Sequence, residues 1–144
     1  MNQFIGIYSK SFVEQLAFLE GIKDALGKTD MSYEQIDGEN IEVFRSSSSD
    51  VLEISMKDIK LFSKKNLLDN YGILMVAHPR SSSDELMSPF LKAILEKYPD
   101  FKVVDLDKNT KETPYVFDKA FIDNVQGDLY VAMESPPKDI GNLV

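Results

Sequence analysis

The chain has 144 residues and a formal net charge of −8, from 24 acidic and 16 basic side chains. That length fits one domain, and a hydrophobic content of 43% argues against wholesale disorder. Cysteine is absent and there is one histidine, which excludes disulfides, thiolate nucleophiles, cysteine-ligated metals and a zinc site of several imidazoles.

The acidic net charge and the absence of membrane signals limit the classes of partner that we expect for the chain. A net negative charge repels nucleic acid and anionic membranes, so we expect a basic protein as partner, no nucleic acid and no membrane. The opening residues have no basic stretch ahead of their short apolar run, and nothing approaches the ~18 consecutive apolar residues of a membrane span. We expect a soluble, cytoplasmic protein.

The first predicted elements are a strand and a helix. Residues 4–8 are an apolar, strand-like run, and Ser9 or Ser11 can cap a helix over about 11–27 that ends at Gly27 in the left-handed conformation. Apolar residues at helical spacing predict its buried face: Phe12, Val13, Leu16, Leu19, Ile22 and Leu26. A polar loop is expected over 28–40, with a turn at Asp37-Gly38.

Two β-prone runs then predict a hairpin over about 41–56, with a serine-rich tip. Residues 57–70 suggest a broken helix. The continuous apolar run 72–77 predicts a strand covered on both faces, which favours a central position and parallel pairing.

The second half alternates helix and strand before it departs from that pattern. A helix is expected over 86–98 and a strand over 102–106, a spacing that fits a parallel crossover unit. Tyr115–Phe117 and Leu129–Met133 are strand-like around a turn at 126–128. We therefore predict a single α/β (or α+β) domain over 1–144 with a mixed sheet and a central strand at 72–77, and a loose C-terminal tail over 138–144.

Two serine-rich loops suggest an anion site. The second follows the predicted central strand, at the edge where open α/β sheets bind ligands. Serine hydroxyls, backbone amides and an arginine fork are donors that suit phosphate, so a nucleotide or flavin is one hypothesis. The alternative is that the serines cap helices and the histidine packs under a loop. The candidate residues are Arg45, Ser46, Ser47, His78, Arg80, Ser81, Ser82 and Ser83.

The second loop also carries a family resemblance. The run Gly72-Ile-Leu-Met-Val-Ala-His-Pro-Arg-Ser-Ser-Ser83, the helix after it and Val103-Val-Asp-Leu106 resemble the opening unit of flavodoxin-like NAD(P)H quinone oxidoreductases. The resemblance implies FMN or FAD as cofactor, with its phosphate held by His78, Arg80, Ser82 and Ser83. It covers residues 72–106.

Clustered carboxylates suggest a different function that needs no cofactor. The acids Glu34, Asp37, Glu39 and Glu42 gather in and after the first long loop, without calcium-loop spacing. Such a cluster steers association with a basic cleft, and Tyr33 beside it is a candidate aromatic anchor, as are Tyr115 and Tyr130.

In general character the chain is similar to toxin-neutralising immunity proteins and phage-encoded inhibitors, which are short, acidic and without a catalytic motif. We predict a non-catalytic acidic binding protein that neutralises a basic partner such as a toxin or nuclease. The phosphate-binding module remains the alternative.

Overall fold

A computed structural model describes residues 4–9, 14–46, 49–56, 72–79, 86–105 and 115–134, with only the backbone described at Gln15 and residues 72–76. The elements in chain order are β1 (Ile5–Ser9), α1 (Gln15–Leu26), β2 (Ser32–Gln35), β3 (Asn40–Phe44), β4 (Leu52–Ser55), β5 (Gly72–Pro79), α2 (Met87–Lys97), β6 (Lys102–Asp105), β7 (Tyr115–Phe117), α3 (Lys119–Asp123) and α4 (Leu129–Ala132).

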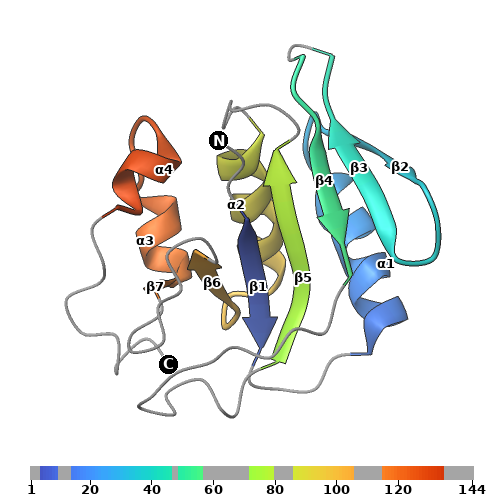
Figure 1. Cartoon of the computed structure of the whole chain (residues 1–144), viewed down its shortest axis with the longest axis horizontal. Coiled ribbons are helices and arrows are strands. Elements are labelled where there is room, and N and C mark those ends of the chain that lie inside the picture. Colours follow the sequence, from blue (N-terminus) through green and yellow to red (C-terminus); the bar gives the residue numbers. More distant parts are fainter. Residues whose placement is uncertain are drawn as a thin grey trace.

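The strands form one sheet in the order β2-β3-β4-β5-β1-β6-β7 (Figure 1). The apolar run expected at 72–77 is the central strand β5, and the hairpin expected over 41–56 is the β3–β4 pair. Both predictions are confirmed, as is the α/β class.

The pairing direction differs from the prediction. Each pair of neighbouring strands described is antiparallel, so the expected parallel neighbours and mixed pairing are absent from this part of the chain. Strands β5 and β6 do run in the same direction and flank α2, but β1 lies between them and pairs with both. The reason is that all five residues of β1 are buried, so the N-terminal strand takes an interior place that an apolar run alone does not assign.

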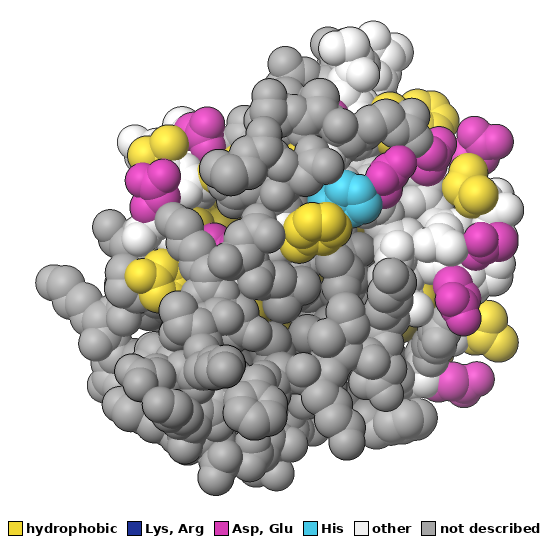
Figure 2. Space-filling view, viewed as in Figure 1, with side chains coloured by type: hydrophobic (Ala, Val, Ile, Leu, Met, Phe, Trp, Pro, Cys, Tyr) yellow, Lys and Arg dark blue, Asp and Glu magenta, His cyan; other side chains and the backbone are white. Residues whose placement is uncertain are grey.

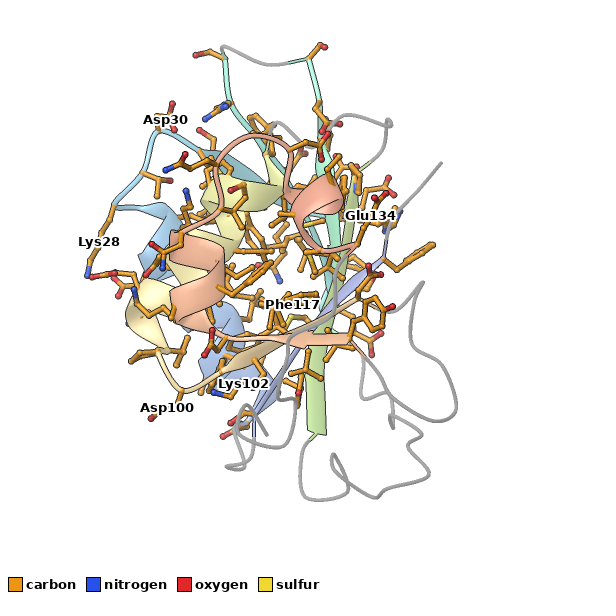
Figure 3. The ribbon with its side chains drawn as sticks, turned by 90° about the vertical axis from the view of Figure 1, so that its left-hand side faces the viewer. Lys28, Asp30, Asp100, Lys102, Phe117 and Glu134 are labelled. Atoms are coloured by element: carbon orange, nitrogen blue, oxygen red, sulfur yellow. The ribbon has the colours of Figure 1, made fainter. Side chains whose placement is uncertain are left out.

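Helices α1 and α2 cover one face of the sheet, behind the strands in Figure 1. Alternation in the β3–β4 hairpin sends four buried side chains towards the helices: Ile41, Val43, Leu52 and Ile54. Phe117 is fully buried in the same core and lies among the side chains between sheet and helices in Figure 3. No helix in the described part is long and apolar enough to cross a bilayer.

Helix α1 follows its prediction with three corrections. It begins at Gln15, since Ser9 ends β1 and Glu14 is the N-cap residue. Leu16 is 64% exposed, whereas Phe18 is fully buried, because the buried stripe starts two positions later. Gly27 is right-handed (φ −62°), because the chain makes another right-handed turn there and the Thr29 hydroxyl donates to the Leu26 carbonyl.

Three other segments also depart from prediction. The loop expected over 28–40 contains the edge strand β2, because its four residues pair with β3 although all are exposed. The strand expected over Leu129–Met133 is helix α4, since the Asp128 carboxylate accepts the Tyr130 N–H and caps a helical turn. Asp118 caps α3 in the same way, and that helix was not predicted. The broken helix at 57–70 and the tail at 138–144 lie outside the described residues.

A close approach joins α1 to the residue that follows α2. An added Cβ at Gly21 would overlap the Tyr98 hydroxyl oxygen. The Tyr98 ring is stacked on Phe101, with centroids 4.5 Å apart, and meets Phe18 edge-on. Space at this helix contact therefore favours glycine, because a larger residue would have to displace the Tyr98 ring.

Candidate protein-binding face

A row of side chains crosses four neighbouring strands. Glu34 on β2 lies directly opposite Glu42 on β3, which lies opposite Glu53 on β4. Glu53 in turn lies opposite His78 on β5. Because directly paired residues share a face, the pairing places three carboxylates and the histidine of the chain in one line.

This row lies on the face of the sheet away from α1 and α2. Its members alternate with the buried residues of β3 and β4, which point towards the helices. In Figure 2 the histidine is followed by acidic side chains that continue towards the right-hand edge, and no described lysine or arginine is visible on this face. The charged side chains that the structure describes on this part of the surface are therefore acidic, apart from the histidine.

The inner end of the row is fixed by two contacts. His78 Nε2 lies 2.7 Å from Glu53 Oε2, and the Phe4 ring contacts the imidazole at a tilt of 36°, with centroids 4.8 Å apart. His78 is half-buried between a carboxylate and an aromatic ring. These two contacts hold the His78 and Glu53 side chains together at the inner end of the row.

A shallow depression of about 260 Å³ coincides with the row. Glu42 and Glu53 line it together with the apolar residue Ile36. Its other lining residues are Asn40, Ile41, Ile54, Ser55 and His78. Carboxylates beside an apolar wall suit a lysine or arginine side chain, which combines a cationic head with an aliphatic stem.

Exposed apolar side chains flank the acids. Ile36 is 53% exposed, and Phe44 on the same face of β3 is 37% exposed. Protein interfaces combine such side chains with charged rims. This stretch of surface, defined by Glu34, Ile36, Glu42, Phe44 and Glu53, is called the acidic face below.

The predicted partner-binding residues do not all lie on the acidic face. Glu34 and Glu42 are in the row, and Glu39 is exposed in the hairpin turn. The Asp37 carboxylate instead organises that turn, because it accepts the N–H groups of Glu39 and Asn40, and the Glu39 N–H is the main cause of its lowered pKa.

The aromatic candidates lie apart from the acidic face. Tyr33 is opposite buried Val43, so it points to the helix side of the sheet, where Lys23 Nζ lies 6.0 Å from its ring centroid. Tyr115 packs against the core and Tyr130 is buried.

The strand residues that border the two serine-rich segments pair with each other at one end of the sheet. Leu52, which follows the first loop, pairs with Pro79, which precedes the second. Ser46 is exposed, and Arg45 lies 3.8 Å from the Asp30 carboxylate. Ser47, Arg80, Ser81, Ser82 and Ser83 lie outside the described residues. Arg45 and His78, the two described residues proposed as nitrogen donors to the anion, thus each have a carboxylate beside them.

The described acids do not assemble a metal site. Within the described ranges, no group of three or more His, Cys, Asp or Glu side chains has an arrangement that would hold a metal ion. The carboxylates of the row are instead spread across three neighbouring strands.

Comparison with known proteins gives no relative: no protein-family model, curated protein or solved structure matches the chain.

Sequence reasoning missed Glu53 as a member of the row and Phe4 as the ring that contacts its histidine. Glu53 is the outward residue between Leu52 and Ile54, and the predicted hairpin already placed its strand beside that of Glu42. That alternation was the available signal for Glu53. Phe4 reaches the row only through the β1–β5 pairing, which no local pattern shows.

Proposed function

We propose that the chain is a non-catalytic acidic binding protein that neutralises a basic partner protein, such as a toxin or nuclease, through the acidic face. The observation that supports this most is the alignment of Glu34, Glu42 and Glu53 on adjacent strands. Side chains directly opposite on a sheet lie about 4.5–5.5 Å apart at their Cβ atoms. Basic side chains of a partner placed over this row would add favourable pairs of opposite charge.

The depression beside Glu42 and Glu53 would receive one lysine or arginine of the partner. Its stem would lie along Ile36, and its cationic head would donate charge-assisted hydrogen bonds to the carboxylates. Around this contact, Phe44 and Ile36 offer apolar area that a partner would bury. The complex would therefore form fast at low ionic strength and dissociate as salt rises.

The phosphate-binding alternative has weaker support. A ligand phosphate at His78 or Arg45 would approach Glu53 or Asp30, so that its negative charge would oppose theirs. The described surface around the histidine is also acidic (Figure 2). We therefore prefer a cationic partner for this face.

A matched pair of charge-reversed variants tests the proposal. Glu34→Lys/Glu42→Lys reverses the row, and Asp100→Lys/Glu134→Lys makes the same change of net charge at exposed sites elsewhere, both labelled in Figure 3. Each form is expressed in the source cells, and its bound proteins are quantified by mass spectrometry. We expect the wild type and the control to retain one basic protein in stoichiometric amount, and the row variant to lose it.

The retained protein is then assayed for the activity that the complex blocks. Recovery of a toxic or nuclease activity when it is separated from the chain would support neutralisation. Equal retention by the row variant and the control would refute the acidic face as the binding surface.

A further inference from the structure

The outer edge of the sheet at β2 is open. β2 is the first strand in the sheet order, and all four of its residues are exposed. Its only strand partner within the described part of the chain is β3. An open edge offers backbone donors and acceptors to an extended segment of another chain.

The hydrogen-bond register shows which groups face outward. The Ile36 N–H donates to the Asn40 carbonyl, whereas the Met56 N–H donates to the Glu39 carbonyl on the other side of β3. Antiparallel bonding alternates along a strand, so Glu34 bonds to Glu42 of β3. The N–H and C=O groups of Tyr33 and Gln35 consequently point to the open edge.

We infer that β2 binds an extended segment of the basic partner as an eighth strand, with lysine or arginine side chains on the acidic face and apolar side chains on the opposite face. This inference rests on the proposed function, because the charge of the acidic face selects the occupant. The added strand would accept and donate backbone hydrogen bonds at Tyr33 and Gln35. Its side chain opposite Glu34 would extend the row by one cation.

The two faces of β2 determine which side chains should alternate along the added partner strand. Glu34 points to the acidic face, where a neighbouring lysine would pair with it. Tyr33 points to the helix side and is 40% exposed, so its ring offers apolar surface to the alternate residue of the added strand. A basic-apolar repeat of period two therefore fits both faces at once.

A second copy of this chain fits the edge poorly. If two β2 strands paired antiparallel through Tyr33 and Gln35, each Glu34 would lie directly opposite the other copy's Glu34. That non-hydrogen-bonded position brings side chains closest together, at about 4.5 Å between Cα atoms, and two carboxylates there repel. The edge therefore selects a basic strand and disfavours self-association.

Two capped peptides of equal charge test the inference, (Lys-Val)4 and (Lys-Pro)4. Proline lacks the N–H that strand pairing needs, so only the first can add to the sheet. Loss of two to four main-chain hydrogen bonds should weaken binding by about tenfold or more. Amide exchange of the full chain, followed by NMR, reports on the edge directly.

We expect (Lys-Val)4 to bind at least about tenfold more tightly than (Lys-Pro)4 and to slow exchange at the Tyr33 and Gln35 amides by a similar factor. Equal binding of both peptides, abolished by Glu34→Lys/Glu42→Lys and without slower exchange, would overturn strand addition and leave the proposed function standing. Absence of binding, or binding unaffected by that charge reversal, would overturn both.

A variant pair at Gln35 gives an independent check. Gln35→Pro removes one outward N–H, at an edge position where proline is tolerated, and Gln35→Ala removes the side chain but keeps the N–H. At equal melting temperatures, we expect the proline variant alone to lose the preference for (Lys-Val)4. Retention of that preference would contradict the inference.

Discussion

Replacing Glu34 by glutamine should stabilise the protein at low salt. Glu34 faces one carboxylate across the β2–β3 pair, that of Glu42. Pairs of like charges directly opposite on a sheet are unfavourable by about 0.2–1 kcal/mol, so removing one charge should raise the free energy of unfolding by about that amount. For a chain of this size, the melting temperature should rise by about 1–4 °C.

The salt dependence of this gain identifies its origin. The Debye length falls from about 10 Å at 0.1 M salt to about 3 Å at 1 M, so the gain should be largest at low salt and nearly vanish at 1 M. Asp100→Asn is the control, because it makes the same charge change at an exposed turn. Thermal and urea unfolding at both ionic strengths measure the difference. A Glu34→Gln protein that is less stable, or equally stabilised at both ionic strengths, would refute the argument.

Further predictions concern the packing of the helices. Gly21→Ala should destabilise the protein by about 1–3 kcal/mol, because the added methyl group overpacks against the Tyr98 ring. In a Tyr98→Ala background the same change should stabilise it by about 1 kcal/mol, because only helix propensity remains. Urea unfolding of the wild type, the two single variants and the double variant would show whether the sign of the effect reverses. Phe117→Ala should cost about 3–5 kcal/mol because its ring is fully buried, and a loss below 1 kcal/mol on denaturation would contradict that burial. Lys97 Nζ donates to Asp24 at 2.7 Å and thereby lowers the pKa of Asp24 below 3.8. A lowered pKa stabilises the fold above the unfolded-state pKa, so Asp24→Asn should reduce the melting temperature slightly at pH 7, and the difference should close as the pH falls below 3.8; a pH-independent difference would argue against the ion pair.

Local periodicity was sufficient for the elements with a long apolar pattern. The central strand β5 and helix α2 follow from continuous or helically spaced apolar residues, a signal that a single sequence contains. Strand β2 was missed because all of its residues are exposed, so its pairing with β3 leaves no hydrophobic signature. Helix α4 was assigned as a strand because its four residues are too few to show a period, although Asp128 gave a capping signal.

The candidate site was only partly predictable for a related reason. Clustering along the chain identified Glu34 and Glu42, but whether two acids share a face depends on register, which is a property of the folded sheet. The register adds Glu53 to the row and directs Tyr33 to the other face. The prediction of a parallel neighbour for β5 was wrong for the same reason, because the insertion of β1 between β5 and β6 joins segments that are far apart in the sequence.

The most direct test of the acidic binding function is native mass spectrometry of the chain purified from its source cells, which preserves both bound proteins and bound small molecules. The proposed function predicts a stoichiometric complex with a basic protein that is absent from the Glu34→Lys/Glu42→Lys variant. A chain that carries a flavin or nucleotide instead, or a complex that survives the charge reversal, would contradict it.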